Sequence, residues 1–135
     1  MRKFKIIVVL LSVGLLLYFI LRPTNQKLKK DLYYKNHPTI IDKAAYELGE
    51  RKDTSAVKAL LTNILDTRMS TNLNFKGMTV CYCRLIALKK ISGLQPPLSL
   101  DQFEVDTTAV EFYLDWAIKE NYINTRNEID INYPD

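Results

Sequence analysis

Cysteine and histidine are scarce in this chain of 135 residues, which holds two cysteines, Cys81 and Cys83, and a single histidine. In a helix the two cysteine side chains point about 200° apart, so they cannot bridge each other or comfortably share a metal ion. One histidine does not complete a zinc set. We therefore predict no metal site and interpret the cysteines as small core residues, with a free or intermolecularly paired thiol as the alternative.

Patterns that usually carry catalysis or cofactor binding are also missing. The four glycines never form a phosphate-binding loop. His37 precedes Pro38 in a predicted turn, where a catalytic base would need a nucleophile partner that the sequence does not indicate. Glu111 and Asp115 are spaced i, i+4, and although paired carboxylates can serve a glycosidase, this spacing is more typical of a solvated helix face. We predict no catalytic residue and no cofactor.

Acidic residues are absent from the first 30 residues, and the formal net charge of +4 comes wholly from that stretch. Residues 31–99 carry a net charge of +4, whereas residues 100–135 carry −7. The high pI is therefore no argument for nucleic-acid binding, which needs a basic patch on the folded body. The only basic cluster there combines Arg51 and Lys52 with Lys89 and Lys90, and we interpret it as solvated surface. We predict neither a nucleic-acid partner nor a small-molecule substrate.

A five-residue motif, called the repeated phrase below, occurs twice and organises the rest of the chain. Asp53-Thr54-Ser55-Ala56-Val57 returns 53 residues later as Asp106-Thr107-Thr108-Ala109-Val110. After each phrase, apolar residues recur at i, i+3, i+4, i+7 and i+8, which is one stripe of an amphipathic α-helix. The matched stripes are Val57, Leu60, Leu61, Ile64 and Leu65, and Val110, Tyr113, Leu114, Ala117 and Ile118. The sequence therefore predicts two equivalent helices.

A second helical pattern precedes each phrase, over residues 40–49 and 83–93. Ala44, Ala45 and Leu48 align with Ala87, Leu88 and Ile91, and small residues at such places let a neighbouring helix approach closely. Gly49 and Gly93 stand where a left-handed residue would end each helix. The repeating unit is therefore a helix, a turn and a second helix, and the sequence contains two copies of it.

This unit resembles the bacterial HEAT-repeat family, the type related to the chromophore lyases. The matching residues are Ala45 to Gly49, Asp53, Ala56 to Leu60, and Leu65-Asp66, although Pro96-Pro97 and an insertion interrupt the second turn. The resemblance implies an all-α fold, a short α-solenoid of two helical hairpins. It also implies that other proteins bind along the row formed by each second helix.

The N-terminal stretch predicts a membrane anchor. Residues 1–5 are basic, and Ile6 to Leu21 is an uncharged run of sixteen residues. That run gives roughly 24 Å of helix, so Lys5 and Arg22 would have to snorkel to match a hydrocarbon core of about 30 Å. The alternatives are a cleaved signal peptide and a buried helix. Basic residues flank both ends, and we weakly favour a body on the extracytoplasmic side.

These patterns divide the chain into an anchor (1–21), a basic juxtamembrane linker (22–38), a HEAT-like repeat domain (39–122) and an acidic tail (123–135). We expect a membrane-tethered protein–protein interaction module or scaffold without a catalytic site. The alternatives are a structural subunit of a larger envelope assembly and, less favoured, a lyase-like enzyme. The predicted partner-binding residues lie on the second helices: Lys58, Asn63, Glu111, Phe112, Asp115 and Trp116.

Phe112 and Trp116 form a second apolar surface, because they lie outside the core stripe of their helix and align with Ala59 and Asn63 of the first copy. A repeat end should present a polar cap, so something must cover these rings. The candidates are a partner protein, the insertion Leu94 to Val105, or the tail. In the tail, Ile129, Ile131 and Tyr133 alternate with polar residues as in a short extended segment.

Overall fold

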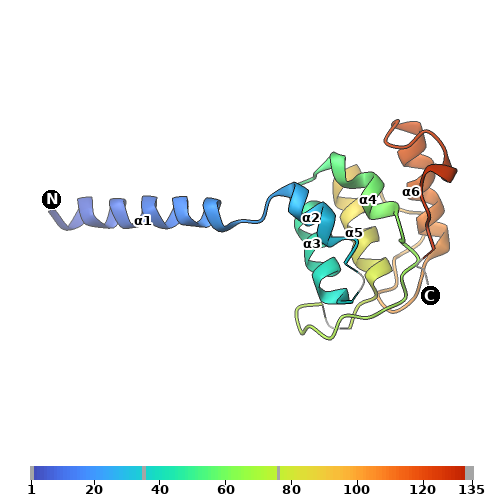
Figure 1. Cartoon of the computed structure of the whole chain (residues 1–135), viewed down its shortest axis with the longest axis horizontal. Coiled ribbons are helices and arrows are strands. Elements are labelled where there is room, and N and C mark those ends of the chain that lie inside the picture. Colours follow the sequence, from blue (N-terminus) through green and yellow to red (C-terminus); the bar gives the residue numbers. More distant parts are fainter. Residues whose placement is uncertain (1, 35, 76, 133–135) are drawn as a thin grey trace.

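The computed structural model describes residues 2–34, 36–75 and 77–132. Within these ranges the secondary structure is helical apart from one isolated bridge between Met69 and Thr79, which agrees with the predicted all-α class. Figure 1 shows α1 extending away from a body in which the other helices pack together. The elements are α1 (Arg2–Leu21), α2 (Asn25–Asp31), α3 (Pro38–Glu50), the 3-10 helix η1 (Thr54–Ala56), α4 (Val57–Leu61), α5 (Val80–Ser92), α6 (Thr107–Lys119) and the 3-10 helix η2 (Arg126–Glu128).

The predicted transmembrane anchor is wrong, because the described part of the chain contains no helix that is both long enough and apolar enough to cross a membrane. The expected helix does form as α1, but Arg2, Lys3 and Lys5 fall in its first turns. The uncharged remainder spans roughly 24 Å, less than a hydrocarbon core of about 30 Å. The predicted membrane contact through residues 6–21 and the single-pass location with an extracytoplasmic body are withdrawn with the anchor.

The segment predicted as a linker contributes a helix to the body. Thr24 begins α2, and its Oγ1 accepts a hydrogen bond from the backbone N–H of Lys27 at 3.2 Å. Leu28 and Leu32 are buried, and α2 packs against α3. Residues spaced i, i+4 lie on the same face of a helix, so these two leucines contact the core together.

The centre of the body is the packing of α3 against α5. Ala44, Ala45 and Ala87 are buried there, as their small size predicts. Gly49 does not end its helix but lies within α3, where a Cβ would come within 2.9 Å of the Cα of Ala87. Its role is to permit this close approach. Gly93 does end α5 in the left-handed conformation, with φ of 71°.

The repeated phrase begins a helix in both copies. The Asp53 carboxylate accepts a hydrogen bond from the backbone N–H of Ser55 at 3.0 Å, and the Asp106 carboxylate accepts one from Ala109 at 2.9 Å. Both contacts satisfy amide groups that lack partners at a helix start. The apolar stripes that follow are buried in both copies, with Leu65 and Ile118 partly exposed at their ends.

The two second helices differ in length, which the repeat did not predict. α6 continues for 13 residues, whereas α4 has five and ends at Leu61. Thr62 is extended, and Asn63 adopts the left-handed conformation with φ of 55°, which asparagine tolerates better than most residues. Ile64 is buried although it lies beyond the helix.

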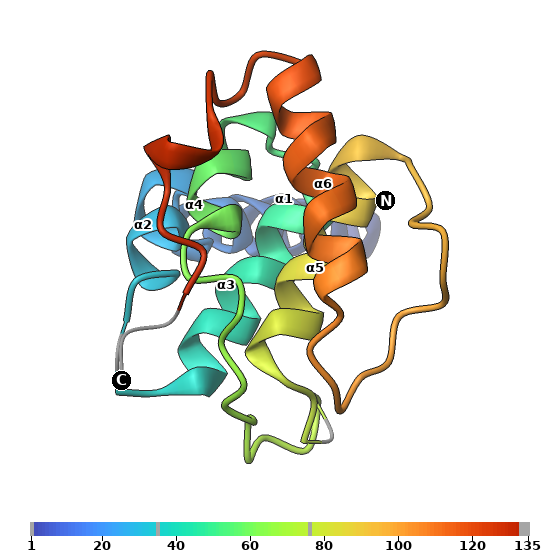
Figure 2. The same cartoon turned by 90° about the vertical axis from the view of Figure 1, so that its right-hand side faces the viewer.

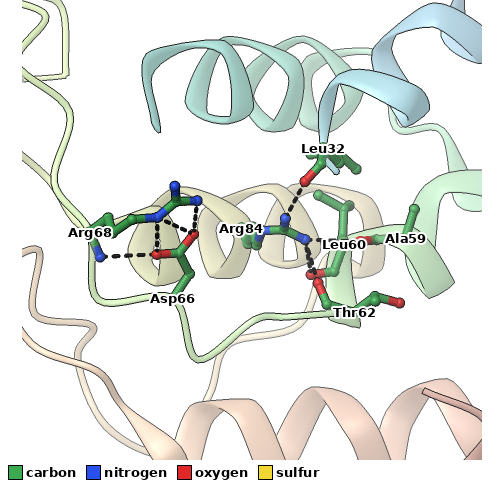
Figure 3. A network of polar contacts seen from close by, with 7 residues as sticks. All are labelled: Leu32, Ala59, Leu60, Thr62, Asp66, Arg68 and Arg84. Carbon is green, nitrogen blue, oxygen red and sulfur yellow. Dashed lines mark hydrogen bonds and ion pairs between the residues drawn. The ribbon is translucent and has the colours of Figure 1, made fainter. Parts of the chain in front are cut away.

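Arg84 explains how α4 can end inside the protein. This side chain of α5 is almost fully buried, and its guanidinium donates hydrogen bonds to four backbone carbonyl oxygens, as Figure 3 shows. The acceptors are Leu32 (2.6 Å), Ala59 (2.9 Å), Leu60 (3.1 Å) and Thr62 (2.7 Å). The carbonyl groups at a helix end otherwise lack partners. Arg84 therefore caps α4 and ties it to the chain that leaves α2.

Burial lowers the pKa of Arg84 to about 10, so its guanidinium remains charged near neutral pH. Charge-assisted hydrogen bonds of this kind are stronger than those between neutral groups. Sequence reasoning missed this role, although Arg84 is the only charge between Val80 and Leu88 in an otherwise largely apolar helix.

Candidate functional site

The last part of the chain lies across the face formed by α4 and α6. We call residues 126–132 the tail segment. Figure 2 shows it, in red, passing from α6 to α4. The backbone N–H of Asn63 donates to the carbonyl oxygen of Asp130 at 2.7 Å, and the N–H of Leu65 donates to that of Ile131 at 3.0 Å. Ile129 is extended, with φ of −134° and ψ of 144°. The pairing resembles the addition of a short strand, although no strand forms.

The early end of α4 makes this pairing available. In a longer helix the N–H of Asn63 would bond to the carbonyl oxygen of Ala59 four residues earlier. Here that oxygen accepts from Arg84 instead, and the Asn63 amide is left to bind Asp130. In place of one helical hydrogen bond of α4, Arg84 thus binds the carbonyl group of Ala59 and the tail segment binds the amide group of Asn63.

Side chains of the tail segment add polar contacts on both helices. The Lys58 ammonium lies 3.3 Å from the Glu128 carboxylate, and the Arg126 guanidinium lies 3.0 Å from Asp115 and also pairs with Glu111. Ile129 and Ile131 are half-buried against the core, while Asp130 and Asn132 are exposed. This alternation was expected for the tail. Tyr133, assigned to the same alternation, lies outside the described residues.

Four of the six predicted partner-binding residues are therefore engaged by the chain's own tail segment. Lys58, Glu111 and Asp115 pair with it through their side chains, and Asn63 binds it through its backbone. The fit is incomplete, because a hollow of about 460 Å³ remains between Leu114 and the tail segment. The contacts at its rim are largely exposed ion pairs, which solvent screens and which therefore contribute little to stability.

Phe112 and Trp116, the other two predicted residues, lie apart from the tail contacts. Both are half-buried, and they border a separate hollow of about 570 Å³ that Leu94 and Tyr122 also line. The rings of Trp116 and Tyr122 are 5.1 Å apart. Of the predicted covers, the start of the insertion is present at Leu94, while the ion pairs and hydrogen bonds of the tail segment fall on α4 and on the Glu111 side of α6.

A larger groove between α2, α3 and α5, which sequence reasoning missed, has a volume of about 800 Å³. Its walls are mainly apolar and aromatic, and charged side chains stand at its rim. Among the lining residues are Ile40, Phe75, Met78, Tyr82, Ile86 and Lys43. The groove depends on α2 folding onto α3, and no local pattern in the sequence indicates that contact.

The two cysteines of the body are buried and held in their protonated form. Burial raises the pKa of Cys81 to about 11 and raises that of Cys83 further, so both thiols stay protonated near neutral pH. A protonated thiol is neither a nucleophile nor a metal ligand. Within the described ranges, no group of three or more His, Cys, Asp or Glu side chains is arranged to hold a metal ion.

Comparisons with protein-family models, curated proteins and solved structures find no match to this chain. The HEAT resemblance therefore has no support beyond the residues that suggested it. Among the surfaces of the described residues, the α4–α6 face carries a bound segment, the tail segment.

Proposed function

We propose that this chain is a protein-interaction module whose α4–α6 face binds an extended peptide segment. One observation carries the proposal: an extended segment of the chain already lies on that face, held by backbone hydrogen bonds to Asn63 and Leu65. Peptides that bind by strand addition gain affinity from such main-chain bonds and specificity from alternate side chains. The tail segment has both features.

The chemical groups of the α4–α6 face determine which kind of partner segment can bind there. The backbone amides of Asn63 and Leu65 bind the carbonyl oxygens of two consecutive residues, Asp130 and Ile131, which requires main-chain groups but no particular side chains. The half-buried positions of Ile129 and Ile131 call for aliphatic side chains, and Lys58 favours an acidic residue just before them. We therefore expect a partner with acidic and aliphatic residues in alternation, in competition with the tail segment.

The direct experiment measures peptide binding with and without the attached tail. A fluorescent peptide of residues 126–135 is titrated into the full chain and into a chain ending at Thr125, and its anisotropy is followed. We expect saturable binding to the shortened chain and binding at least about ten-fold weaker to the full chain, because an attached segment competes at an effective concentration near millimolar.

A matched peptide with Ile129→Ser and Ile131→Ser keeps the charge and should lose most of the binding. Lys58→Ala in the shortened chain should weaken it by a smaller factor, since an exposed ion pair contributes little. Equal affinity for the full and shortened chains, or no binding to a shortened chain that is still helical by circular dichroism, contradicts the proposal.

A further inference from the structure

The hollow beside Phe112 and Trp116 is lined by the C-terminal ends of two helices. Ile91 and Ser92 are the last residues of α5, and Trp116 and Lys119 belong to the last turn of α6. The carbonyl groups at a helix C-terminus carry a partial negative charge, equivalent to about half an elementary charge per helix. The hollow therefore lies where a positively charged group is favoured.

Three aromatic side chains contribute to the wall of this hollow. Phe112 and Trp116 are spaced i, i+4 and share one face of α6. Tyr122 is turned back towards the same helix, because its backbone N–H donates to the carbonyl oxygen of Ala117 at 2.9 Å. The rings of Trp116 and Tyr122 are 5.1 Å apart and inclined at 48°, so they do not stack flat on each other. Ring faces attract cations, and tryptophan does so most strongly.

The charged groups around the hollow also favour a cation. Glu120 is exposed, and its side chain has no polar contact among the described residues. The Asp115 carboxylate lies beside it on the rim and is shared with Arg126 at 3.0 Å. Lys119 carries the only positive charge among the residues that line the hollow. Residues 100–135 as a whole have a net charge of −7, so a cation approaches an acidic part of the chain.

The behaviour of Lys119 indicates which kind of cation fits. This lysine lines the hollow, yet no cation of the described residues lies over the rings of Phe112, Trp116 or Tyr122. A primary ammonium is strongly hydrated and would lose that hydration against a ring. A quaternary ammonium has no N–H groups to hydrate, and aromatic side chains recognise it through its methyl groups. The volume of about 570 Å³ lies within the range of small-molecule sites, about 300–1,000 Å³.

We propose that this hollow binds a quaternary ammonium group, with its methyl groups against Trp116 and Tyr122 and with Glu120 as the balancing charge. The group belongs either to a free small molecule or to the trimethylated side chain of a lysine in a peptide, and both present the same trimethylammonium head. The tail segment binds on the Glu111 side of α6, so this proposal and the proposed peptide-binding face can fail independently.

The only tryptophan of the chain, Trp116, supplies the readout. Choline chloride is titrated into the full chain at constant ionic strength, and the fluorescence of Trp116 is followed. We expect a saturable change. The neutral isostere 3,3-dimethylbutan-1-ol has carbon in place of the charged nitrogen and should bind at least about five-fold more weakly. Ammonium chloride, whose cation keeps its hydration, should give no saturable change.

Variants that retain Trp116 test the rings. Tyr122→Leu and Phe112→Leu keep apolar volume but remove a ring face, so each should weaken choline binding about two- to five-fold. Circular dichroism checks that both chains remain helical.

Variants of exposed charges test the electrostatic part without touching the core. Glu120→Gln should weaken choline binding about two-fold or more. Glu104→Gln removes an exposed acid that does not line the hollow, and as the matched control it should leave the affinity unchanged. Lys119→Gln should strengthen binding about two-fold or more, because it removes the like charge at the site. A purely structural role for Lys119 would produce no such gain.

A peptide arm distinguishes the two sources of the group. A tripeptide with trimethyl-lysine is compared with choline and with the same tripeptide carrying unmodified lysine. Affinity at least about ten-fold above that of choline identifies a lysine side chain as the source, and lower affinity identifies a free small molecule. The proposal is overturned by equal binding of choline and its neutral isostere, by the absence of a saturable change with both trimethylammonium probes, or by unchanged affinity in folded Tyr122→Leu and Lys119→Gln chains.

Discussion

Arg84 is the residue on which the local arrangement depends. Its four hydrogen bonds replace the helical bonds that α4 gives up, and they join the end of α2 to the end of α4. A methionine of similar length could fill the space, yet it would leave four buried carbonyl groups without a donor. Removing one partner from a buried charged network usually costs more than the network itself contributes.

We therefore expect Arg84→Met to lower the free energy of unfolding by about 3–5 kcal/mol in urea denaturation. Lys89→Met is the control, since it removes the same charge from the same helix but from an ammonium group without a polar contact among the described residues. That variant should change stability by about 0.5 kcal/mol or less. Similar losses in the two variants would contradict the role given to Arg84.

Asp42 makes the free energy of unfolding depend on pH in the direction opposite to that of most carboxyl groups. Its pKa rises from 3.8 to about 6 on folding, because burial disfavours the charged form. The folded protein thus binds more protons between these two pH values, and the contribution of Asp42 to stability decreases as the pH rises from about 4 to about 6. Above that window the ionised carboxylate destabilises the fold.

Asp42→Asn should therefore raise the free energy of unfolding near pH 7.5, by about 1–3 kcal/mol, while the difference should shrink towards zero near pH 4. Urea denaturation at several pH values measures both effects. A loss of stability in the variant at pH 7.5 would mean that hydrogen bonds to the carboxylate outweigh the cost of its burial.

At the scale of elements, the contact between α3 and α5 sets how closely the two copies of the repeat pack. Gly49 permits it, since any Cβ there would meet the backbone of Ala87. The composition of the two helices predicted a close approach, but the exact role of Gly49 was not predictable, because a glycine near a helix end is more often a helix stop.

Gly49→Ala tests the contact. We expect a net loss of about 1–2 kcal/mol, because the steric cost of overpacking exceeds the gain of about 0.5–1 kcal/mol from replacing glycine in a helix. Gly14→Ala in α1 is the matched control, because a Cβ there meets nothing within 4 Å and should be neutral or stabilising. Thermal denaturation of both variants distinguishes a packing effect from a propensity effect.

The elements also show where local patterns stop being informative. The apolar stripes after Asp53 and Asp106 predicted two helices and most of their buried side chains. The stripe continues to Leu65, however, while the helix ends at Leu61. The reason lies 23 residues further on, at Arg84, and a periodicity cannot contain that information. The apolar run of α1 likewise predicted a helix correctly and a membrane span wrongly.

Across the whole molecule, the middle of the chain and its C-terminal part carry net charges of opposite sign. Residues 31–99 carry a net charge of +4 and residues 100–135 carry −7. The tail segment places Glu128 at Lys58, one contact between these two regions. The sequence alone predicted this charge asymmetry and the alternation of the tail. It did not give the place where the tail binds, because that place exists only once α4 has ended and the amides of Asn63 and Leu65 are free to pair.

The central claim is that these two amides bind an extended segment that can be exchanged. Amide hydrogen exchange of Asn63 and Leu65, followed by NMR, tests it most directly. We predict slow exchange in the full chain, exchange at least about ten-fold faster in the chain ending at Thr125, and restored protection when the peptide of residues 126–135 is added. Protection that persists without the tail, or that the added peptide does not restore, would contradict the account.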